Sequence, residues 1–547
     1  MDSPIEQPYL SCTSPILKLF KTINHPIADG TFRWGKQYTD SNPTLSTAFF
    51  ATSFPQSILI VKGMAMAKVV FINLAPNFYD KHAIYSLSSL LAAQNHSVHY
   101  IPNIPFKKIL NRLEEIRPEL VLYSSFTPSL PKYFELDRLV KERLNVKSLI
   151  GGNGPTYDPD LVANSTIDAL CMGEGEAALI DYVDSDFSGT KNIIERGDIT
   201  PDRCNTPDYF AFTNLDDLPM PRRHLVYEQD SVLKNQPSKQ FMAGRGCPYK
   251  CTYCHNHAFN EKFKDSGEVI RYKSVDYLIE EIKEVQHRYP LKTVVFQDDV
   301  FILKKSWVME FCEKFPREIG LGFTCNVKAE ITVQEDIVKA LKEANCVGAS
   351  WSIESGNEFL RNEVLKRNTS KSQILRCSEN LNKYKIPHRI GNVIGIPGEK
   401  FENMRETIEL NIEAKPTMAL ANIFVPYPGL ELTDYALKHN FVDQKDCRYP
   451  PEDIYQMSVL KFSPEQKLQM HKILFLFPYF VRYPSLYFNE TNFKLLLQLP
   501  RWFLRFLYEP FYVFNMAKIH RVWASIRMTV ALFRRYISTA VFSDKSQ

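Results

Sequence analysis

Three cysteines lie within eight positions of one another in the stretch GRGCPYKCTYCHNH, residues 244–257. Cys247, Cys251 and Cys254 are separated by three and then two residues, and the stretch follows a predicted strand. A loop of this length allows three thiolates to converge on one metal centre, and cysteine is a preferred ligand of iron–sulfur and zinc centres. Closed zinc sites and simple ferredoxin-type clusters take four protein ligands, and no fourth cysteine lies near the loop. The spacing therefore predicts a metal centre with one open position.

Two other interpretations are compatible with the same residues. His255 or His257 could complete a zinc site, because imidazole is also a zinc ligand. The three cysteines could also be structural residues that bind nothing.

The composition is that of a globular chain with several domains. Of its 547 residues, 44% are hydrophobic and 23% are charged, so the signature of disorder is absent. The net charge of +4 does not require nucleic acid as a partner. The 11 cysteines are an odd number and indicate a reducing compartment. Neither a signal peptide nor a long apolar run is recognisable, so we expect a cytoplasmic protein without a membrane span.

Residues 64–185 alternate short apolar runs with helical stretches, a pattern typical of a doubly wound parallel α/β sheet. Ligands of such sheets bind outside the carboxyl ends of the strands, and small, hydroxyl or acidic residues follow three of the predicted strands. The candidate binding residues at this edge are Ser124, Ser125, Thr127, Gly151, Gly152, Gly154, Glu174 and Glu176. The preceding residues 1–63 show no sustained period and are interpreted as an irregular, disordered extension.

Two further regions follow a predicted linker at residues 186–235, which has turn chemistry. Six strand candidates separated by helical sequence lie between residues 236 and 455 and predict a partial (β/α)6 barrel, with its chemistry at the carboxyl ends of the strands. Residues 456–547 are rich in aromatic and basic residues and are expected to be helical. This C-terminal region either packs as a cap on the barrel or contacts a membrane peripherally.

The segment CPYKCTYC resembles the CxxxCxxC motif of the radical S-adenosylmethionine (SAM) superfamily. The resemblance implies that Cys247, Cys251 and Cys254 hold a 4Fe-4S cluster whose fourth iron chelates SAM. It also implies that Tyr253 packs near the adenine of SAM. The place of the motif, directly after the first predicted barrel strand, agrees with this interpretation.

Three other barrel segments resemble motifs of the same superfamily. FQDD corresponds to the acidic motif after the second strand, SIESG to the fourth-strand motif and GNVIGIPGE to the fifth-strand GxIxGxxGE motif. The SAM contacts that this resemblance implies are Gln297, Asp298, Asp299, Ser352, Glu354 and Gly395. Taken alone, the two aspartates would be helix N-caps and the other segments would be ordinary strand-end turns.

The segments IGGNGPTYDPDLV and MGEGE resemble the amino-terminal domain of cobalamin-dependent radical SAM enzymes. This resemblance implies a cobalamin site along the edge of the first sheet. The segment DKHAIY departs from the DxHxxG motif, in which a histidine ligates cobalt, because Tyr85 replaces the glycine. We therefore interpret His82 as the first residue of a helix rather than as a cobalt ligand.

These resemblances together imply an oxygen-sensitive enzyme that cleaves SAM reductively to a 5′-deoxyadenosyl radical. An electron donor such as ferredoxin or flavodoxin would supply the electron, and the expected reaction is methylation of an unactivated carbon in a small-molecule or lipid-like substrate. Cyclisation, rearrangement or oxidation without methyl transfer is an alternative within the superfamily. An alternative of another class is a non-catalytic, metal-binding interaction module. No catalytic side chain is identified from the sequence, and no nucleic acid partner is expected.

Overall fold

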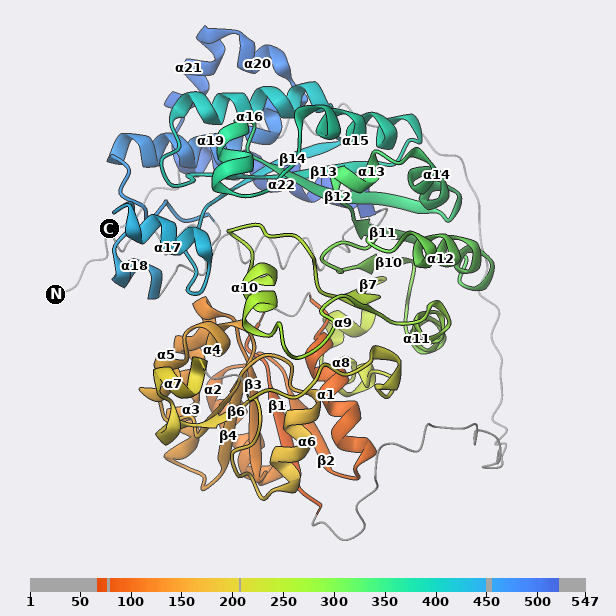
Figure 1. Ribbon diagram of the computed structural model, residues 1–547, viewed down its shortest axis with the longest axis vertical. Helices are drawn as coiled ribbons and strands as arrows, with labels where there is room; N and C mark the ends of the chain where they lie inside the picture. The colour runs from red at the N-terminus through yellow and green to blue at the C-terminus, as the bar shows by residue number, and fades with distance from the viewer. Residues whose placement is uncertain (1–65, 76–78, 206–207, 449–454, 521–547) are drawn as a thin grey trace, which may run out of the picture. The chain divides into compact units, whose positions relative to one another are not determined.

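The computed structural model describes residues 66–75, 79–205, 208–448 and 455–520, all of which belong to the compact unit Val61–Gln547 (Figure 1). The predicted extension at residues 1–63 therefore lies outside the described residues. None of the helices in the described part of the chain has the length and apolar character needed to cross a membrane.

The first sheet is doubly wound, as predicted. Its order is β2-β1-β3-β4-β5-β6, formed by β1 (Lys68–Ile72), β2 (Ser97–Ile101), β3 (Leu120–Ser124), β4 (Lys147–Gly151), β5 (Ala169–Cys171) and β6 (Ile193–Glu195). Alternate strand residues face opposite sides, so Phe71 packs with α1 (His82–Ala93) and α6 (Glu176–Asp184). Val70 packs with α2 (Phe106–Ile116) and α3 (Leu130–Lys141) on the other side.

The linker prediction for residues 186–235 is wrong in one respect. Strand β6 belongs to this segment and pairs antiparallel with β5, so the sheet is not parallel throughout. Ile193 and Ile194 are buried in the two cores of the domain. Burial of these two apolar side chains stabilises the pairing of the segment with the sheet. Three short helices follow, α7 (Pro201–Asn205), α8 (Arg223–Tyr227) and α9 (Ser231–Asn235).

The second sheet contains the six predicted barrel strands, all parallel. Its order is β14-β13-β12-β11-β10-β7, formed by β7 (Ser238–Phe241), β10 (Thr293–Phe296), β11 (Gly322–Asn326), β12 (Cys346–Glu354), β13 (His388–Ile394) and β14 (Met418–Ile423). The helices that follow these strands are α11 (Val275–Arg288), α12 (Lys305–Glu318), α14 (Glu335–Glu343), α15 (Lys371–Lys383) and α16 (Phe401–Ala414). A small antiparallel pair, β8 (Gly244–Arg245) and β9 (Arg271–Tyr272), leads into and out of the cysteine loop and α10 (His255–Lys262).

The two faces of this sheet differ in chemistry. Phe241, Phe296, Trp351 and Ile390 belong to one buried apolar core with residues of the covering helices. The residues between them in the strands point to the opposite, inner face, where the side chains are polar or small. These inner-face residues include Gln240, Asn326, Ser350, Ser352, Arg389 and Gly391, none of which is fully buried. An accessible polar inner face is expected where a barrel binds a ligand.

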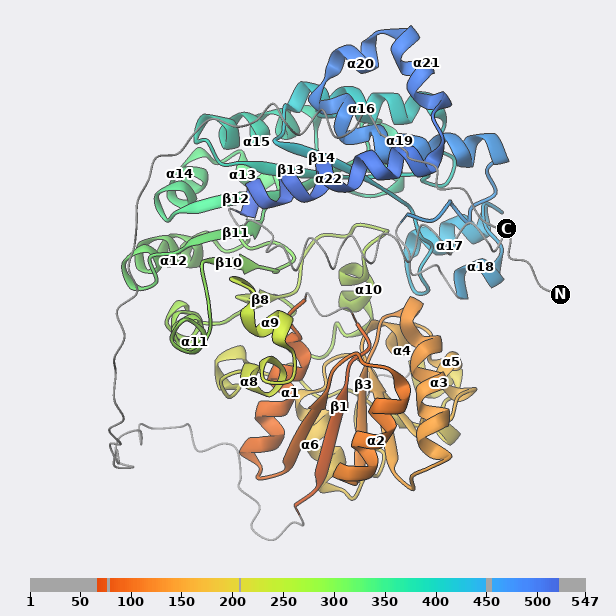
Figure 2. The same ribbon diagram turned by 180° about the vertical axis from the view of Figure 1, so that it is seen from behind.

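The C-terminal region is helical, as predicted, over its described residues. It contains α17 (Glu431–Lys438), α18 (Gln444–Arg448), α19 (Pro464–Arg482), α20 (Pro484–Phe488), α21 (Glu490–Gln498) and α22 (Arg501–His520). The run from Ile473 to Phe477 in α19 is buried against β14 and α16, which confirms the cap interpretation for this helix. Helix α22 crosses β12, as Figure 2 shows from behind.

Candidate functional site

The three cysteines of the predicted metal centre lie in the loop between β8 and α10. Cys251 is buried, Cys247 and Cys254 are partly buried, and none forms a disulfide. Burial raises the pKa of the Cys254 thiol to about 11, and the nearby charges of Cys251 and Cys247 add to this rise. The thiols are therefore close enough to influence one another. Three grouped sulfur donors with no fourth cysteine fit a cluster that keeps one iron open.

The zinc alternative receives no support from the positions of the two histidines. His257 Nε2 lies 3.5 Å from Glu431 Oε2, and the ring of His255 packs between Tyr157 and Tyr427, with centroid distances of 4.9 and 5.8 Å. In the described ranges, no three His, Cys, Asp or Glu side chains are arranged to hold a single ion. A structural zinc needs four donors around one ion.

Asp298 holds the chain that leads into the cysteine loop. Its fully buried carboxylate accepts hydrogen bonds from the backbone N–H of Gly244 at 2.6 Å and of Ala243 at 3.1 Å. Burial raises its pKa to about 7. The N-cap interpretation of the FQDD segment is wrong, because the next helix, α12, begins only at Lys305. Asp298 thus fixes where the loop starts.

The other two polar residues of this segment, Gln297 and Asp299, are exposed at the carboxyl end of β10. Asp299 forms a hydrogen bond with Asn256, two residues after the last cysteine, and its charge contributes to the raised pKa of Cys254. Both residues therefore lie at the same end of the barrel as the cysteines, and their contact with SAM stays a prediction.

Glu354 occupies a strained position at the end of β12. Its φ of 71° is in the left-handed region, which a non-glycine residue adopts only when its surroundings enforce it. Tyr253 donates a hydrogen bond from its hydroxyl to Glu354 Oε1 at 2.9 Å, so the cysteine loop and the fourth barrel strand are joined. Arg367 donates to the Ser352 carbonyl at 2.8 Å and to the Tyr253 hydroxyl at 3.4 Å. Strain with convergent polar groups at a strand end is typical of a functional site.

Sequence reasoning missed three ionisable residues at this end of the barrel. Glu399 accepts hydrogen bonds from the backbone N–H of Gly395 at 2.5 Å and so holds the turn after β13, where φ of Gly395 is 74°. Lys328, after β11, places its ammonium 4.0 Å from the centroid of the Tyr249 ring in the cysteine loop. Arg367 is the third. Only Glu399 had a sequence signal, since it ends the GNVIGIPGE segment.

The glycines and hydroxyls of the first sheet meet at one edge, as predicted. Ser124 pairs with Gly151 at the ends of β3 and β4, and Ser125 follows directly. A Cβ on Gly152 would lie 2.3 Å from the Ser125 carbonyl oxygen, and φ of Gly152 is 104°, so only glycine fits. A Cβ on Gly154 would lie 3.1 Å from the side chain of Leu130 and from the backbone of Phe126, both in the segment after β3. The glycines therefore let the two loops pack closely on each other, and we call this edge of small residues the glycine cradle.

Thr127 completes this edge. It is buried and begins a short 3₁₀ helix, Thr127–Ser129, directly beyond the exposed ring of Phe126. Contact of any of these edge residues with cobalamin stays a prediction.

Glu174 and Glu176, both predicted cobalamin contacts, form ion pairs with arginines of the barrel domain. Glu176 accepts a hydrogen bond from Arg245 at 2.6 Å, and Glu174 pairs with Arg245 at 3.1 Å and with Arg271 at 2.5 Å. The two arginines belong to β8 and β9, next to the cysteine loop. The carboxylates therefore join the edge of the first sheet to this loop through charge-assisted hydrogen bonds. Their contact with cobalamin stays a prediction.

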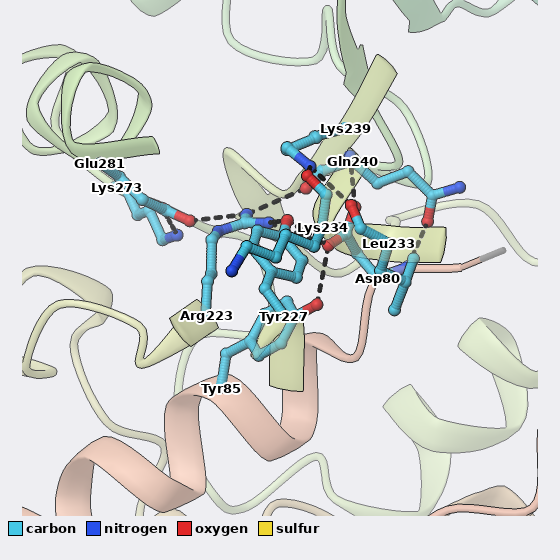
Figure 3. A network of polar contacts seen from close by, with 10 residues as sticks. All are labelled: Asp80, Tyr85, Arg223, Tyr227, Leu233, Lys234, Lys239, Gln240, Lys273 and Glu281. Carbon is cyan, nitrogen blue, oxygen red and sulfur yellow. Dashed lines mark hydrogen bonds and ion pairs between the residues drawn. The ribbon is translucent and has the colours of Figure 1, made fainter. Parts of the chain in front are cut away.

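A buried polar network joins the same two regions on the other side of the loop (Figure 3). Asp80 accepts hydrogen bonds from Tyr85 at 2.7 Å, from Tyr227 at 2.6 Å and from the Gln240 backbone at 2.7 Å, and it pairs with Arg223 at 3.3 Å. In the DKHAIY segment, Tyr85 stands where the cobalt-binding pattern has glycine. Its hydroxyl donates a hydrogen bond to Asp80, so this tyrosine has a structural role in the network.

His82 is the first residue of α1, as predicted. Burial lowers the pKa of its imidazole to about 4, so the ring is neutral at physiological pH. In the described part of the chain its Nε2 is buried without a hydrogen-bond partner, and the ring lines a cavity of about 50 Å³ together with Tyr277 and Lys273.

Comparison with known proteins agrees with both halves of this description. Residues 242–410 match the family model of the radical SAM superfamily, and residues 68–183 match that of the B12 binding domain. An uncharacterized methyltransferase of Pyrococcus horikoshii is 26% identical over 66% of this chain and 79% of its own length. The anaerobic magnesium-protoporphyrin IX monomethyl ester cyclase of Cereibacter sphaeroides is 21% identical over 62% of this chain and 58% of its own length.

A solved structure shares the fold. The cobalamin-dependent SAM radical enzyme OxsB, with aqua-cobalamin and SAM bound, superposes with a TM-score of 0.61 at 14% identity. The superposition covers 87% of this chain and 76% of that one.

Proposed function

We propose, from the premise that this chain is a radical SAM enzyme with a B12 binding domain, that it methylates an unactivated carbon of its substrate. Its cofactors are a 4Fe-4S cluster, SAM and cobalamin. One observation carries the proposal. Tyr157, at the end of the glycine cradle of the first sheet, donates a hydrogen bond to the carbonyl of His255 at 3.3 Å. The edge that we assign to cobalamin therefore touches the residue next to Cys254, which supports the proposal that the two cofactors lie next to each other at one reaction space.

The chain's own residues position and shield this space. When bound, the cluster with SAM would supply a 5′-deoxyadenosyl radical, and cobalamin would supply a transferable methyl group. Cys247, Cys251 and Cys254 would hold the cluster, and Asp298 would fix the loop that carries them. Tyr253 is kept in place by its hydrogen bond to Glu354. The aromatic rings around His255 would exclude water from the space between the two sites.

The SAM contacts follow from the same geometry. Ser352 and Glu354 on β12, Gly395 after β13, and Gln297 with Asp299 after β10 all lie at the carboxyl ends of barrel strands. Asp298 lies there too, although its carboxylate already binds two backbone N–H groups. We propose that this ring of residues surrounds SAM.

A second outcome is supported by one of the relatives. The protein of Cereibacter sphaeroides is named as a cyclase, so ring closure without methyl transfer is the alternative function. The mass of the product separates the two, because methylation adds one methyl group and cyclisation does not.

The proposal includes an electron donor such as ferredoxin or flavodoxin and a reducing compartment such as the cytoplasm. It also includes peripheral membrane contact through α22. Trp502, Phe506 and Phe514 are 63%, 49% and 58% exposed, and they follow one another along the outer side of this helix up to the exposed Lys518. Exposed aromatic rings with basic residues are typical of helices that lie in a membrane interface.

Sedimentation with vesicles of equal amounts of phosphatidylglycerol and phosphatidylcholine tests the membrane contact. Replacing the three rings by serine should reduce binding, whereas Met309→Ser, at a 41% exposed position on α12, should not. Equal binding of both variants and the wild type would remove membrane contact from the proposal.

Anaerobic reconstitution tests the main proposal. We expect four iron, four sulfide and one cobalamin per chain in the wild type, and 5′-deoxyadenosine on addition of SAM and a reductant. Cys251→Ser should lose the cluster and keep cobalamin, because the cobalamin cradle lies on a different sheet. A chain with a full cluster that forms no deoxyadenosine would instead be the non-catalytic metal-binding module.

A further inference from the structure

Arg389 points onto the inner face of the barrel sheet. The next residue in β13, Ile390, is fully buried in the outer core, and Asn392 binds Asn411 of the covering helix α16 at 3.2 Å. Because side chains alternate along a strand, Arg389 lies on the opposite side from these two residues. Its partner in the register with β12 is Ser350, another inner-face residue.

Helix α22 covers this part of the inner face. A Cβ on Gly348 of β12 would lie 2.7 Å from the side chain of Ile519, so the helix touches the sheet. Burial raises the pKa of Tyr508 and Tyr512, and the charge of Arg389 opposes this rise. The guanidinium therefore lies near both phenols, between the sheet and the helix that Figure 2 shows crossing it. The carboxylate of Glu509 also lies near them, because its charge adds to the rise in both pKa values.

Arg389 lacks an anionic partner within the described ranges. Its one hydrogen-bond partner there is the thioether of Met516, with Nη1 to Sδ at 3.9 Å, and no carboxylate forms an ion pair with it. Other interior arginines are well satisfied. Arg223 pairs with two carboxylates, and Arg361 donates to three backbone carbonyls. Arg389 is only partly buried, so water reaches its guanidinium donors, and an anionic group of a ligand would take the place of that water.

The position is close to the reaction space. Two residues further along β13, Gly391 pairs with Ser352, and at about 3.3 Å of rise per residue this places Arg389 about 7 Å below that pair. Tyr512 also lies near Tyr79 of the β1–α1 loop, because the charge of Tyr79 contributes to its raised pKa. A molecule bound at Arg389 would thus lie below the SAM-binding end of the barrel and next to the domain that binds cobalamin.

We propose that Arg389 binds an anionic group of the substrate, either a carboxylate or a phosphate. The inference rests on the proposed function, since it takes the inner face as the substrate surface. A planar guanidinium binds both kinds of anion through paired hydrogen bonds. The apolar parts of α22 around Arg389 would contact the uncharged remainder of the substrate, so the substrate class is an apolar molecule with an acidic group.

Calorimetric titration of the full chain, loaded with cluster and SAM under anaerobic conditions, tests the proposal. The probes are benzoate and phenyl phosphate, with benzamide as the neutral counterpart of benzoate. We expect both anions, or one of them, to bind the wild type and benzamide to bind more weakly. Arg389→Met should weaken the anion by about tenfold or more, as expected for the loss of charge-assisted hydrogen bonds, and Arg389→Lys should keep part of the affinity. The anion that binds with the higher affinity identifies the acidic group of the substrate as a carboxylate or a phosphate.

Matched measurements separate this role from a structural one. Arg376→Met removes an exposed arginine from the outer helix α15 and should leave probe binding unchanged. Removal of a partly exposed charge that pairs with no carboxylate of the described residues should leave the Tm of Arg389→Met unchanged or raised, whereas removal of a structural arginine would lower it. Equal affinity of Arg389→Met and the wild type, or no binding of either anion to the wild type, would overturn the proposal.

Two further readouts keep the outcomes distinct. Loss of SAM binding in Arg389→Met would assign the residue to the SAM carboxylate and would also overturn the proposal. Iron content and deoxyadenosine formation, measured on the same samples, report on the proposed function independently of probe binding.

Discussion

Replacing Arg223 with methionine tests whether the buried network in Figure 3 holds the two domains together. The guanidinium lies 3.3 Å from Asp80 and 2.9 Å from Glu281, and all three side chains are almost completely buried. It also stacks over the ring of Phe241 at 4.2 Å. Methionine fills a similar volume, so the variant removes charge and hydrogen bonds with little change in packing.

The expected loss can be worked out from these distances. A pair of unit charges about 3.3 Å apart attracts by about 5 kcal/mol at an effective dielectric constant of about 20. Desolvation of Arg223 offsets part of this attraction, and removing one partner of a buried pair typically costs about 3–5 kcal/mol. Glu281 keeps its contact with Lys273 at 2.6 Å, so most of the cost arises at Asp80.

Urea unfolding of the cofactor-free full chain measures this loss. Arg317→Met is the control, because Arg317 pairs with Glu313 on the surface, where such a pair contributes less than about 1 kcal/mol. Adding Asp80→Asn to Arg223→Met should recover part of the stability, since it removes the unpaired charge. The reasoning is refuted if Arg223→Met costs no more than the control, or if the effects of the Asp80 and Arg223 substitutions simply add.

Three other outcomes are expected. Burial raises the pKa of Glu399 from 4.5 to about 8, so the folded state keeps a proton that the unfolded state loses and stability falls as pH rises through this interval; Glu399→Gln should flatten the fall in Tm between about pH 5 and pH 8, and an unchanged profile would contradict the shift. Gly152→Ala should lower cobalamin content and Tm because its Cβ meets the Ser125 carbonyl oxygen, whereas Gly197→Ala, with nothing within 4 Å, should change neither. Glu354→Ala should weaken SAM binding in calorimetry while the iron content stays at the wild-type level, and parallel loss of iron would show a structural role instead.

Most of the secondary structure follows from local sequence patterns. The runs TVVF and RIGNVI alternate with amphipathic helices, and the structure places β10 and β13 there. The cysteine loop was equally predictable, because its ligands are neighbours in the chain. The position of His82 at the start of α1 was also predictable, since a helix boundary depends on a few adjacent residues.

The contacts that sequence reasoning did not foresee share a different cause. Glu174 and Glu176 follow a strand at a ligand-binding edge, yet each pairs with an arginine of the barrel domain. The segment that contains β6 has many turn residues, but its two isoleucines add a strand to a sheet formed by earlier residues. In both cases a distant partner decided the outcome, and a local pattern carries no information about that partner.

The sequence by itself determined the parallel strands of both sheets with the helices between them, the three sulfur ligands and the two cofactor domains, because these depend on neighbours in the chain. Only the tertiary structure decided which charges meet. Asp80 and Arg223 are separated by 143 positions, yet they form one buried pair. It likewise showed that Arg389 has no carboxylate opposite it within the described residues. The free energy of a charged side chain depends on what surrounds it in space, and these surroundings come from segments that only folding brings together.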